Sequence, residues 1–191
     1  MDDKLKQSNE FILENSRACY DSFPEQLKKE EDEFSKKIIS ANESNKNKLI
    51  KLYNFSDKVL AQTDNFTACK SGCSHCCHMN VDITILEAEY IEKNTGIKMK
   101  KINFSKQHTL ENFLGKPCPF LKDNKCSIYQ FRPFVCRKHV SFDKDNYWCN
   151  IDNYIKEPIT KIKFSYEDSY YDITKYTKTI AADIRDFFEK I

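Results

Sequence analysis

The sequence predicts a mainly α-helical single domain with a long N-terminal helical arm, a loop-rich cysteine centre and a C-terminal helix. The chain of 191 residues is 40% hydrophobic and 13% aromatic, which suffices for one core of ordinary size. Apolar residues recur at helical spacing towards both ends, and eight of the nine cysteines lie between positions 69 and 149. We therefore expect residues 1–66 to form the arm, 67–150 the metal-binding cysteine region, and 151–191 a helical segment that packs on the core.

The arm has the composition of helices. No glycine occurs before Phe66, and Pro24 is the only proline there. A first helix is expected over residues 5–23, and Pro24 fits the first turn of a second, long helix. That helix is predicted by an apolar stripe: Phe34, Ile38, Ala41, Leu49, Leu52, Val59 and Leu60. Such an amphipathic arm is typical of scaffold packed on its own domain, and binding of a protein partner is the alternative.

Shorter elements are predicted further along the chain. Val81–Ile83 should be extended, and Thr84–Glu87 has the capping-box pattern that starts a helix. Gly96 can take the left-handed conformation that ends this helix. Residues 98–150 lack a clean period and predict loops, with a hairpin across Asp123–Lys125. A closing C-terminal helix is predicted by a second stripe: Ile173, Tyr176, Ile180, Ile184, Phe187, Phe188 and Ile191.

The cysteines indicate metal binding rather than disulfides. The chain shows no secretory signal and no transmembrane run, so a reducing, cytoplasmic location is expected. Cysteine clusters in that compartment are typical of metal or catalytic sites. The odd count of nine cysteines also argues weakly against a fully paired framework. A formal net charge of +2 gives no reason to expect nucleic acid or a membrane surface as a partner.

The first cysteine group consists of Cys69, Cys73, Cys76 and Cys77. In a helix-like turn all four thiols would point within about a quarter of the circumference, although Gly72 permits other backbone shapes. The C-x-x-C spacing of Cys73 and Cys76 suits zinc or one edge of an iron–sulfur cluster. Adjacent side chains such as those of Cys76 and Cys77 diverge. This favours a polynuclear centre or two sites that share the segment, with one of the pair serving as a buried apolar residue as the alternative.

The second group consists of Cys118, Cys126, Cys136 and Cys149. We expect it to share metal sites with the first group, so that a sulfur of Cys76 or Cys77 lies within about 4–7 Å of a sulfur of the second group. Cys19 stands apart in the arm and should not bind metal. With eight thiols available, no histidine is required as a ligand, although three lie near the groups: His75, His78 and His139.

Together the two groups resemble the YkgJ family of bacterial cysteine-cluster proteins, described as having a CxxCxxCC domain that chelates zinc or iron. The resemblance rests on two strings: Cys69-x3-Cys73-x2-Cys76-Cys77 and Cys118-Pro119-Phe120-Leu121-x4-Cys126-x-Ile128-Tyr129-x2-Arg132-Pro133-x2-Cys136-Arg137. It covers roughly residues 69–149. This chain has three residues after Cys69 where the domain's name has two, and Asp123–Lys125 where a glycine is common. One branch of the family resembles flagellin lysine methylases, which implies an iron-dependent modifying enzyme as one possible activity.

A centre with four thiolates carries a net charge of about −2 and requires compensating donors or cations. Arg132 and Arg137 are the predicted cofactor-binding residues, and Arg132 could bond carbonyls or sulfurs beside Cys136. Aromatic and aliphatic residues should form a small core that excludes water from the metal: Phe120, Leu121, Ile128, Tyr129, Phe131 and Phe134.

The expected function is that of a metal-binding protein that holds an iron–sulfur cluster or zinc through eight cysteines, with a role in redox chemistry or metal handling. Eight candidate ligands and one adjacent pair favour the iron–sulfur cluster over a single zinc ion. Two alternatives stay open: an iron-dependent modifying enzyme, and a zinc-stapled module that binds a protein through the helical arm. No nucleophile–base arrangement and no phosphate-binding loop can be assembled from the sequence, so it does not decide whether the protein is an enzyme.

Overall fold

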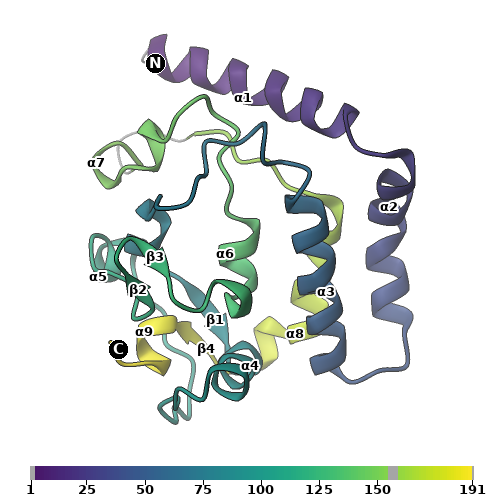
Figure 1. Ribbon diagram of the computed structural model, residues 1–191. Helices are drawn as coiled ribbons and strands as arrows, with labels where there is room; N and C mark the ends of the chain where they lie inside the picture. Colours follow the sequence, from purple (N-terminus) through teal and green to yellow (C-terminus); the bar gives the residue numbers. More distant parts are fainter. Residues whose placement is uncertain (1–2, 155–158, 191) are drawn as a thin grey trace.

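The computed structural model describes residues 3–154 and 159–190, and it confirms a mainly helical fold (Figure 1). The N-terminal part consists of α1 (Asp3–Asp21), α2 (Glu25–Ser40) and α3 (Asn45–Leu60). Helix α1 lies across one end of the molecule, and α2 and α3 run side by side. The first helix is confirmed, and Pro24 lies directly before α2, at its N-cap. Stacked rings of Phe34 and Phe55, with centroids 4.2 Å apart, join α2 to α3.

The single long helix predicted through residue 60 is wrong, because the chain reverses between α2 and α3. Ala41 has an extended conformation with ψ of 134°. Ser44 then caps α3, and its hydroxyl accepts a hydrogen bond from the Asn47 N–H at 3.2 Å. Serine is a favoured N-cap because this bond satisfies an N–H group that has no partner within the helix. The apolar stripe is continuous in sequence, but its two halves face each other across the reversal.

The predicted short elements of the central region are confirmed. Strand β1 (Asp82–Thr84) leads into α4 (Ile85–Thr95), which has a capping box at its start and Gly96 at φ 75° after its end. Strands β2 (Leu121–Lys122) and β3 (Lys125–Cys126) form the hairpin. Asp123 and Asn124 have φ of 50° and 58° in its two-residue turn, where asparagine and aspartate tolerate the left-handed region. The other elements are α5 (Leu110–Phe113), α6 (Phe134–Lys138) and α7 (Ile151–Tyr154), with 3-10 turns at His75–His78, Tyr129–Phe131 and Tyr147–Cys149.

The prediction of one continuous C-terminal helix is also wrong. A 3-10 turn (Ser165–Asp168) and α8 (Ser169–Thr174) are followed by Lys175 in the left-handed region at φ 49°, a second 3-10 turn (Tyr176–Lys178), strand β4 (Ala181–Asp183) and α9 (Ile184–Phe187). Strand β4 pairs antiparallel with β1, a long-range contact that the helical spacing of the apolar residues does not reveal. The apolar residues are nevertheless buried as expected, with Ile184 and Phe187 at 1% and 0% exposure. Ile191, the last residue of the stripe, lies outside the described residues.

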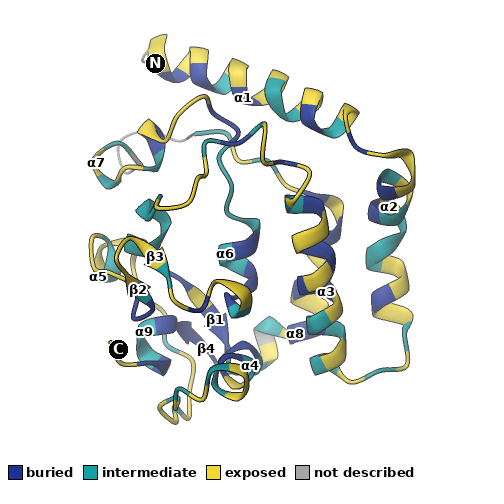
Figure 2. Cartoon of the chain, viewed as in Figure 1, coloured by how far each residue is buried: buried dark blue, intermediate teal, exposed yellow. Residues whose placement is uncertain are grey.

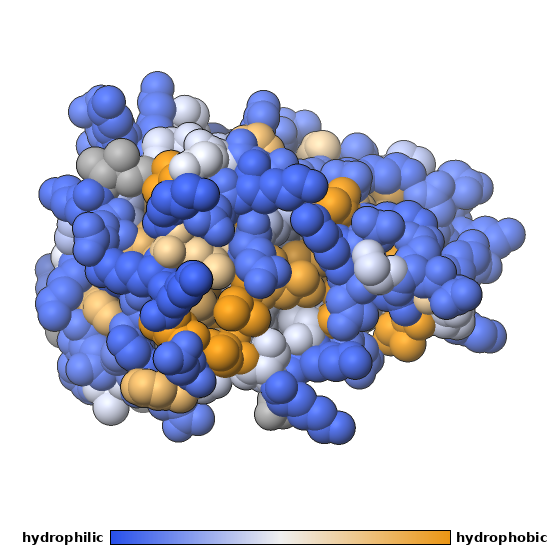
Figure 3. Space-filling view, turned by 90° about the horizontal axis from the view of Figure 1, so that it is seen from below, coloured by the Kyte–Doolittle hydropathy of each residue, from blue (hydrophilic) through white to orange (hydrophobic). Residues whose placement is uncertain are grey.

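Buried side chains form two clusters, and the buried faces of α1, α2 and α3 turn inward (Figure 2). The first cluster joins the three N-terminal helices to aromatic residues from α6 and the C-terminal part, including Phe134, Tyr166 and Tyr170. The second cluster is built from β1, α4, the second cysteine string, β4 and α9. The helical arm is therefore part of a shared core. Charged and polar side chains cover most of the face seen from below, with apolar groups between them (Figure 3).

Glu87 is a fully buried carboxylate that joins these two clusters. It accepts hydrogen bonds from the hydroxyls of Tyr53 at 2.8 Å and Tyr170 at 2.6 Å. It also accepts bonds from the backbone N–H groups of Phe134 at 2.9 Å and Thr84 at 3.1 Å. These two N–H groups lie at the starts of α6 and α4, where a negative charge is favourable. One side chain thus fixes both helices.

The buried tyrosines give the fold an expected alkaline limit. Burial is the main cause that raises the pKa of Tyr53, Tyr166 and Tyr170 above the ordinary 10.0, and the Glu87 charge adds to it at Tyr53 and Tyr170. The unfolded chain therefore loses these protons first, and stability that is fully present below pH 10 is lost as pH rises above it. We expect the urea midpoint to fall steeply above about pH 10, with phenolate absorbance appearing together with unfolding. A folded protein in which all ten tyrosines ionise near pH 10 would contradict this.

Within the part of the chain that the structure describes, no helix combines the length and the apolar character needed to cross a membrane.

Candidate metal centre

The first cysteine string does not form one helix-like turn. Gly72 has φ of 91°, in the left-handed region, and only His75–His78 forms a 3-10 turn. Cys69 and Cys73 precede this turn, and Cys76 and Cys77 lie within it. The glycine therefore divides the string into an outer half, in which Cys69 is exposed, and an inner half that faces the second core cluster.

The second string meets the inner half of the first. The backbone N–H of Cys118 donates a hydrogen bond to the carbonyl of Cys77 at 2.7 Å, and the N–H of Gly115 donates to the carbonyl of His78 at 2.8 Å. Four thiols from the two strings belong to or pack against the same buried cluster: Cys77, Cys118, Cys126 and Cys136. Residues about 40 positions apart in the chain are thus brought together on one apolar wall.

Backbone N–H groups are aimed at several of these sulfurs. The Cys118 sulfur accepts a hydrogen bond from the N–H of Phe120, and the Cys126 sulfur accepts one from Ile128. In both cases the donor is two residues after the cysteine, so the local turn itself supplies it. Such donors stabilise the thiolate form, which is the form that binds metal. Burial acts in the opposite direction and dominates, so that the pKa of Cys118 is raised to about 11 and that of Cys126 is also raised.

Cys136, in α6, lies close to the sulfurs of the other inner cysteines. Burial raises its pKa well above the ordinary 9.0, and the neighbouring sulfurs of Cys76, Cys118 and Cys126 raise it further because like charges repel. Without a cation, the thiols of Cys118, Cys126 and Cys136 stay protonated near neutral pH. A bound metal ion reverses that balance, because a coordinating thiol is deprotonated outright.

The thiols of the adjacent residues Cys76 and Cys77 are hydrogen bonded to each other. A hydrogen bond from the Cys77 thiol is the main cause that lowers the pKa of Cys76, and the positive charge of Arg132 also lowers it. The same bond is the main cause that raises the pKa of Cys77, which the sulfurs of Cys118 and Cys136 raise further. Cys76 is therefore the first of the pair to become a thiolate.

The outer thiols lie around Ser141. The backbone N–H of Ser141 donates to the sulfur of Cys69, and its side chain is hydrogen bonded to Cys149. Burial raises the pKa of Cys149 to about 12, and the charges of Cys69, Cys73 and Cys76 also raise it. Cys149 thus gathers with the outer half of the first string. No motif in the sequence marks Ser141.

Arg132 and Arg137 belong to the second string, but Asp57 of α3 binds both of them. Arg137 is 1% exposed; it forms a short ion pair with Asp57 and donates to the carbonyls of Arg132 at 2.9 Å and Gln130 at 2.6 Å. Arg132 donates to Asp57 at 3.3 Å and to the Tyr129 carbonyl at 2.8 Å. The donors of Arg137 are thus committed to protein oxygens, whereas the charge of Arg132 also reaches the sulfurs of Cys76 and Cys126.

Most of the predicted apolar shell is confirmed. Phe120, Ile128 and Phe134 are buried, and Leu121 and Phe131 are partly buried beside the thiols. The prediction for Tyr129 is wrong, because this residue is 63% exposed. The Arg132 guanidinium lies 3.8 Å from the centroid of its ring. The indole of Trp148 is buried and donates to the hydroxyl of Ser8 in α1 at 2.9 Å, which ties the outer region to the arm.

A further arginine, Arg185, was not predicted as part of the site. It lies in α9 and donates hydrogen bonds to the carbonyl of Cys77, in the first string, at 3.3 Å and to the carbonyl of Lys116, just before the second string, at 2.7 Å. It is far from either cysteine motif in the sequence, and nothing about its neighbours marks it.

The donor set fits a thiolate-bound metal centre in type and number. Cys118 is buried and the other inner cysteines are partly buried. Several of their thiols have N–H donors, and two arginines lie close enough to lower the pKa of individual thiols. Among residues 3–154 and 159–190, no three or more cysteine, histidine, aspartate or glutamate side chains are arranged so that they could hold one metal ion. The arrangement is therefore a gathered set of free thiols rather than a closed cage of ligands.

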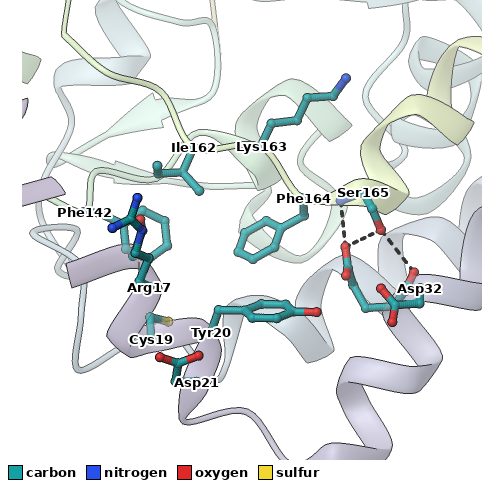
Figure 4. A pocket seen from close by; sticks show the side chains of 12 residues that line it. Arg17, Cys19, Tyr20, Asp21, Asp32, Phe142, Ile162, Lys163, Phe164 and Ser165 are labelled. Carbon is teal, nitrogen blue, oxygen red and sulfur yellow. Dashed lines mark hydrogen bonds between the residues drawn. The ribbon is translucent and has the colours of Figure 1, made fainter. Parts of the chain in front are cut away.

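A pocket of about 530 Å³ lies elsewhere, between α1, α2 and residues 162–165 (Figure 4). The sulfur of Cys19 is the one thiol among its described lining residues. Cys19 is 1% exposed, and burial raises its pKa to about 11, so it is a poor nucleophile at neutral pH. Glu31 at the rim accepts hydrogen bonds from the N–H and the hydroxyl of Ser165, both at 2.6 Å. We assign no chemistry to this pocket.

Comparison with known proteins identifies the cysteine region alone. Residues 68–151 match the family model CxxCxxCC, whose description is "Putative zinc- or iron-chelating domain". The match includes every cysteine of both strings and excludes α1, α2 and α3 and the C-terminal part with β4 and α9. No curated protein and no solved structure matches the chain.

Proposed function

Because residues 68–151 match the CxxCxxCC family model, we propose that this protein holds an iron–sulfur cluster through thiols of both cysteine strings. The observation that carries the proposal is the convergence of Cys77, Cys118, Cys126 and Cys136 on one buried cluster. Cys76 lies beside them, and its sulfur accepts a hydrogen bond from the Cys77 thiol. The eight thiols of the two strings are twice the four that a single tetrahedral zinc ion uses, and this supports a polynuclear centre.

The ligands we propose for the inner centre are four of the five inner thiols, those of Cys76, Cys77, Cys118, Cys126 and Cys136. Cys69, Cys73 and Cys149 would complete the set of eight as outer thiols around Ser141, close enough to affect the ionisation of Cys149. The N–H donors at Cys118 and Cys126, with the charges of Arg132 and Arg185, would offset the negative charge of the thiolates. An iron–sulfur cluster bound here would supply one-electron redox chemistry, while zinc would supply a structural cross-link.

The role that follows is redox chemistry or metal handling in the cytoplasm. The inner thiols pack against a buried apolar cluster, whereas Cys69 is exposed, so a centre here would have one apolar side and one accessible side. A protein partner bound through residues 1–66 stays a prediction. Much of the apolar surface of those helices is already used inside the molecule.

An absorption spectrum of the anaerobically purified protein tests the proposal. We expect broad absorbance near about 400 nm, with iron and acid-labile sulfide present in equal amounts. The absorbance should disappear on treatment with an iron chelator and a reductant. If the protein contained about one or two zinc ions per chain and showed no such band, the bound metal would be zinc and not an iron–sulfur cluster. Protein that holds neither metal in stoichiometric amount, as isolated or after reconstitution, would refute metal binding.

A further inference from the structure

We propose that Arg185 is a positioning residue that holds the two cysteine strings in register at the metal centre. The inference rests on the proposed function, because it concerns the strings that would supply the ligands. It goes beyond the family match, because Arg185 lies outside residues 68–151. The residues that form the metal site would then depend on a side chain from α9 that the cysteine domain itself does not contain.

The guanidinium of Arg185 contacts backbone carbonyls on both sides. From the first string it binds the carbonyls of Cys77 at 3.3 Å and Met79 at 3.2 Å. From the segment that leads into Cys118 it binds the carbonyls of Lys116 at 2.7 Å and Pro117 at 3.3 Å. The planar guanidinium presents several donors in fixed directions. One side chain can therefore join two chain segments, and a lysine ammonium cannot reproduce this geometry.

Arg185 is itself held in place by a buried carboxylate. Asp183, in β4, is 0% exposed and accepts bonds from Nη1 of Arg185 with both oxygens, at 2.9 and 3.1 Å. Asp183 also accepts the backbone N–H of Val81 at 2.7 Å, next to β1. The ring of Phe113 lies 5.0 Å from the guanidinium. The arginine is thus anchored to the sheet formed by β1 and β4, and it links this sheet to the backbone beside the thiols of Cys77 and Cys118.

Arg185 reinforces a weak point of the proposed site. One direct backbone bond is seen between the cysteines of the two strings, the 2.7 Å bond from the Cys118 N–H to the Cys77 carbonyl. A single bond of this kind contributes only about 0.5–1.5 kcal/mol. The carbonyl that accepts it is also bound by Arg185.

The test uses the full chain loaded with Co²⁺, whose thiolate charge-transfer absorbance reports how many sulfurs bind the metal. Two variants are made, R185M and R185K, with R17M in exposed α1 as the matched control. We expect both Arg185 variants to show weaker charge-transfer absorbance and to release Co²⁺ to a chelator at least about 10-fold faster, which corresponds to about 1.4 kcal/mol. R17M should match the wild type. Full rescue by R185K, or wild-type behaviour of both variants, would overturn the inference.

Hydrogen exchange in the metal-free protein gives a second readout. The Cys118 amide should lose protection in R185M and R185K while amides of α1–α3 keep theirs, because the helical part is packed in a different cluster. If R185M fails to fold, R185K decides, since it keeps the charge and most of the volume. A wild-type protein that binds no Co²⁺ would count against the proposed function, and the exchange experiment would still decide whether Arg185 joins the strings.

Discussion

Replacement of Cys136 by serine is expected to remove most of the bound metal. The Cys136 thiol is buried in α6 among the sulfurs of Cys76, Cys118 and Cys126, so no water or other side chain can easily take its place. A serine hydroxyl remains protonated and binds zinc or iron poorly compared with a thiolate. Metal per chain, measured by elemental analysis of protein purified without oxygen, should fall to less than about one fifth of the wild-type value, a loss of the size expected for a ligand.

The control for this prediction is Cys19→Ser. Cys19 is 1% exposed and packs in the first cluster, with the N-terminal helices, away from both cysteine strings. Metal content should stay at the wild-type level even if the substitution lowers stability. Substitutions at Cys73, Cys76 and Cys126 should follow Cys136. Loss of metal in folded Cys19→Ser, or full retention in Cys136→Ser, would contradict the assignment of the ligands.

Replacement of Glu87 by alanine should destabilise the protein by about 4 kcal/mol. Two buried tyrosine hydroxyls and two backbone N–H groups would lose their acceptor, and each unsatisfied buried group costs about 1–3 kcal/mol before relaxation. Domains of this size are stable by only about 5–15 kcal/mol. The variant should therefore be close to unfolding at 37 °C, which urea titration at 15 °C would quantify.

Glu89 provides the matched control, because it lies on the same helix but is exposed. Glu89→Ala should change stability by no more than about 0.5 kcal/mol. Glu87→Gln keeps the volume and one acceptor oxygen, so it should fall between the wild type and Glu87→Ala. If Glu87→Ala costs less than about 1 kcal/mol, the carboxylate does not hold α4 and α6 together as proposed.

The sequence predicts what local chemistry decides. Thr84 and Glu87 form their capping box, Gly96 ends the helix, and Asp123–Asn124 turn the hairpin, because each of these depends on residues only a few positions apart. The reversal before Ser44 and strand β4 depend on distant partners. An apolar stripe at helical spacing is equally compatible with several short elements, each of which buries one or two of the apolar residues. This is the case after Ser169, where α8, a 3-10 turn, β4 and α9 follow one another.

The same distinction applies to the metal site. The spacing of the cysteines reveals the two strings in the sequence. In the structure, four of these cysteines pack in or against one buried cluster: Cys77, Cys118, Cys126 and Cys136. The residues that support them are single side chains with no motif: Asp57 is 75 positions from Arg132, and Arg185 is 108 positions from Cys77. Their roles follow only from the three-dimensional packing, so no pattern in the sequence could have marked them.

The pairing of β1 with β4 also has a consequence for biosynthesis. The Val81 N–H and the Asp183 carboxylate are 102 positions apart, so the ribosome synthesises every thiol of the two strings before it makes the strand and the arginine that hold them. At about 5–20 residues per second, the segment from Cys149 to Arg185 takes a few seconds to synthesise. During that time the thiols that have already left the ribosome are open to solvent, oxidants and whatever metal ions the cell contains. We expect correct metal loading to follow release of Arg185 from the ribosome, and chains stalled before that point to carry loosely bound, exchangeable metal.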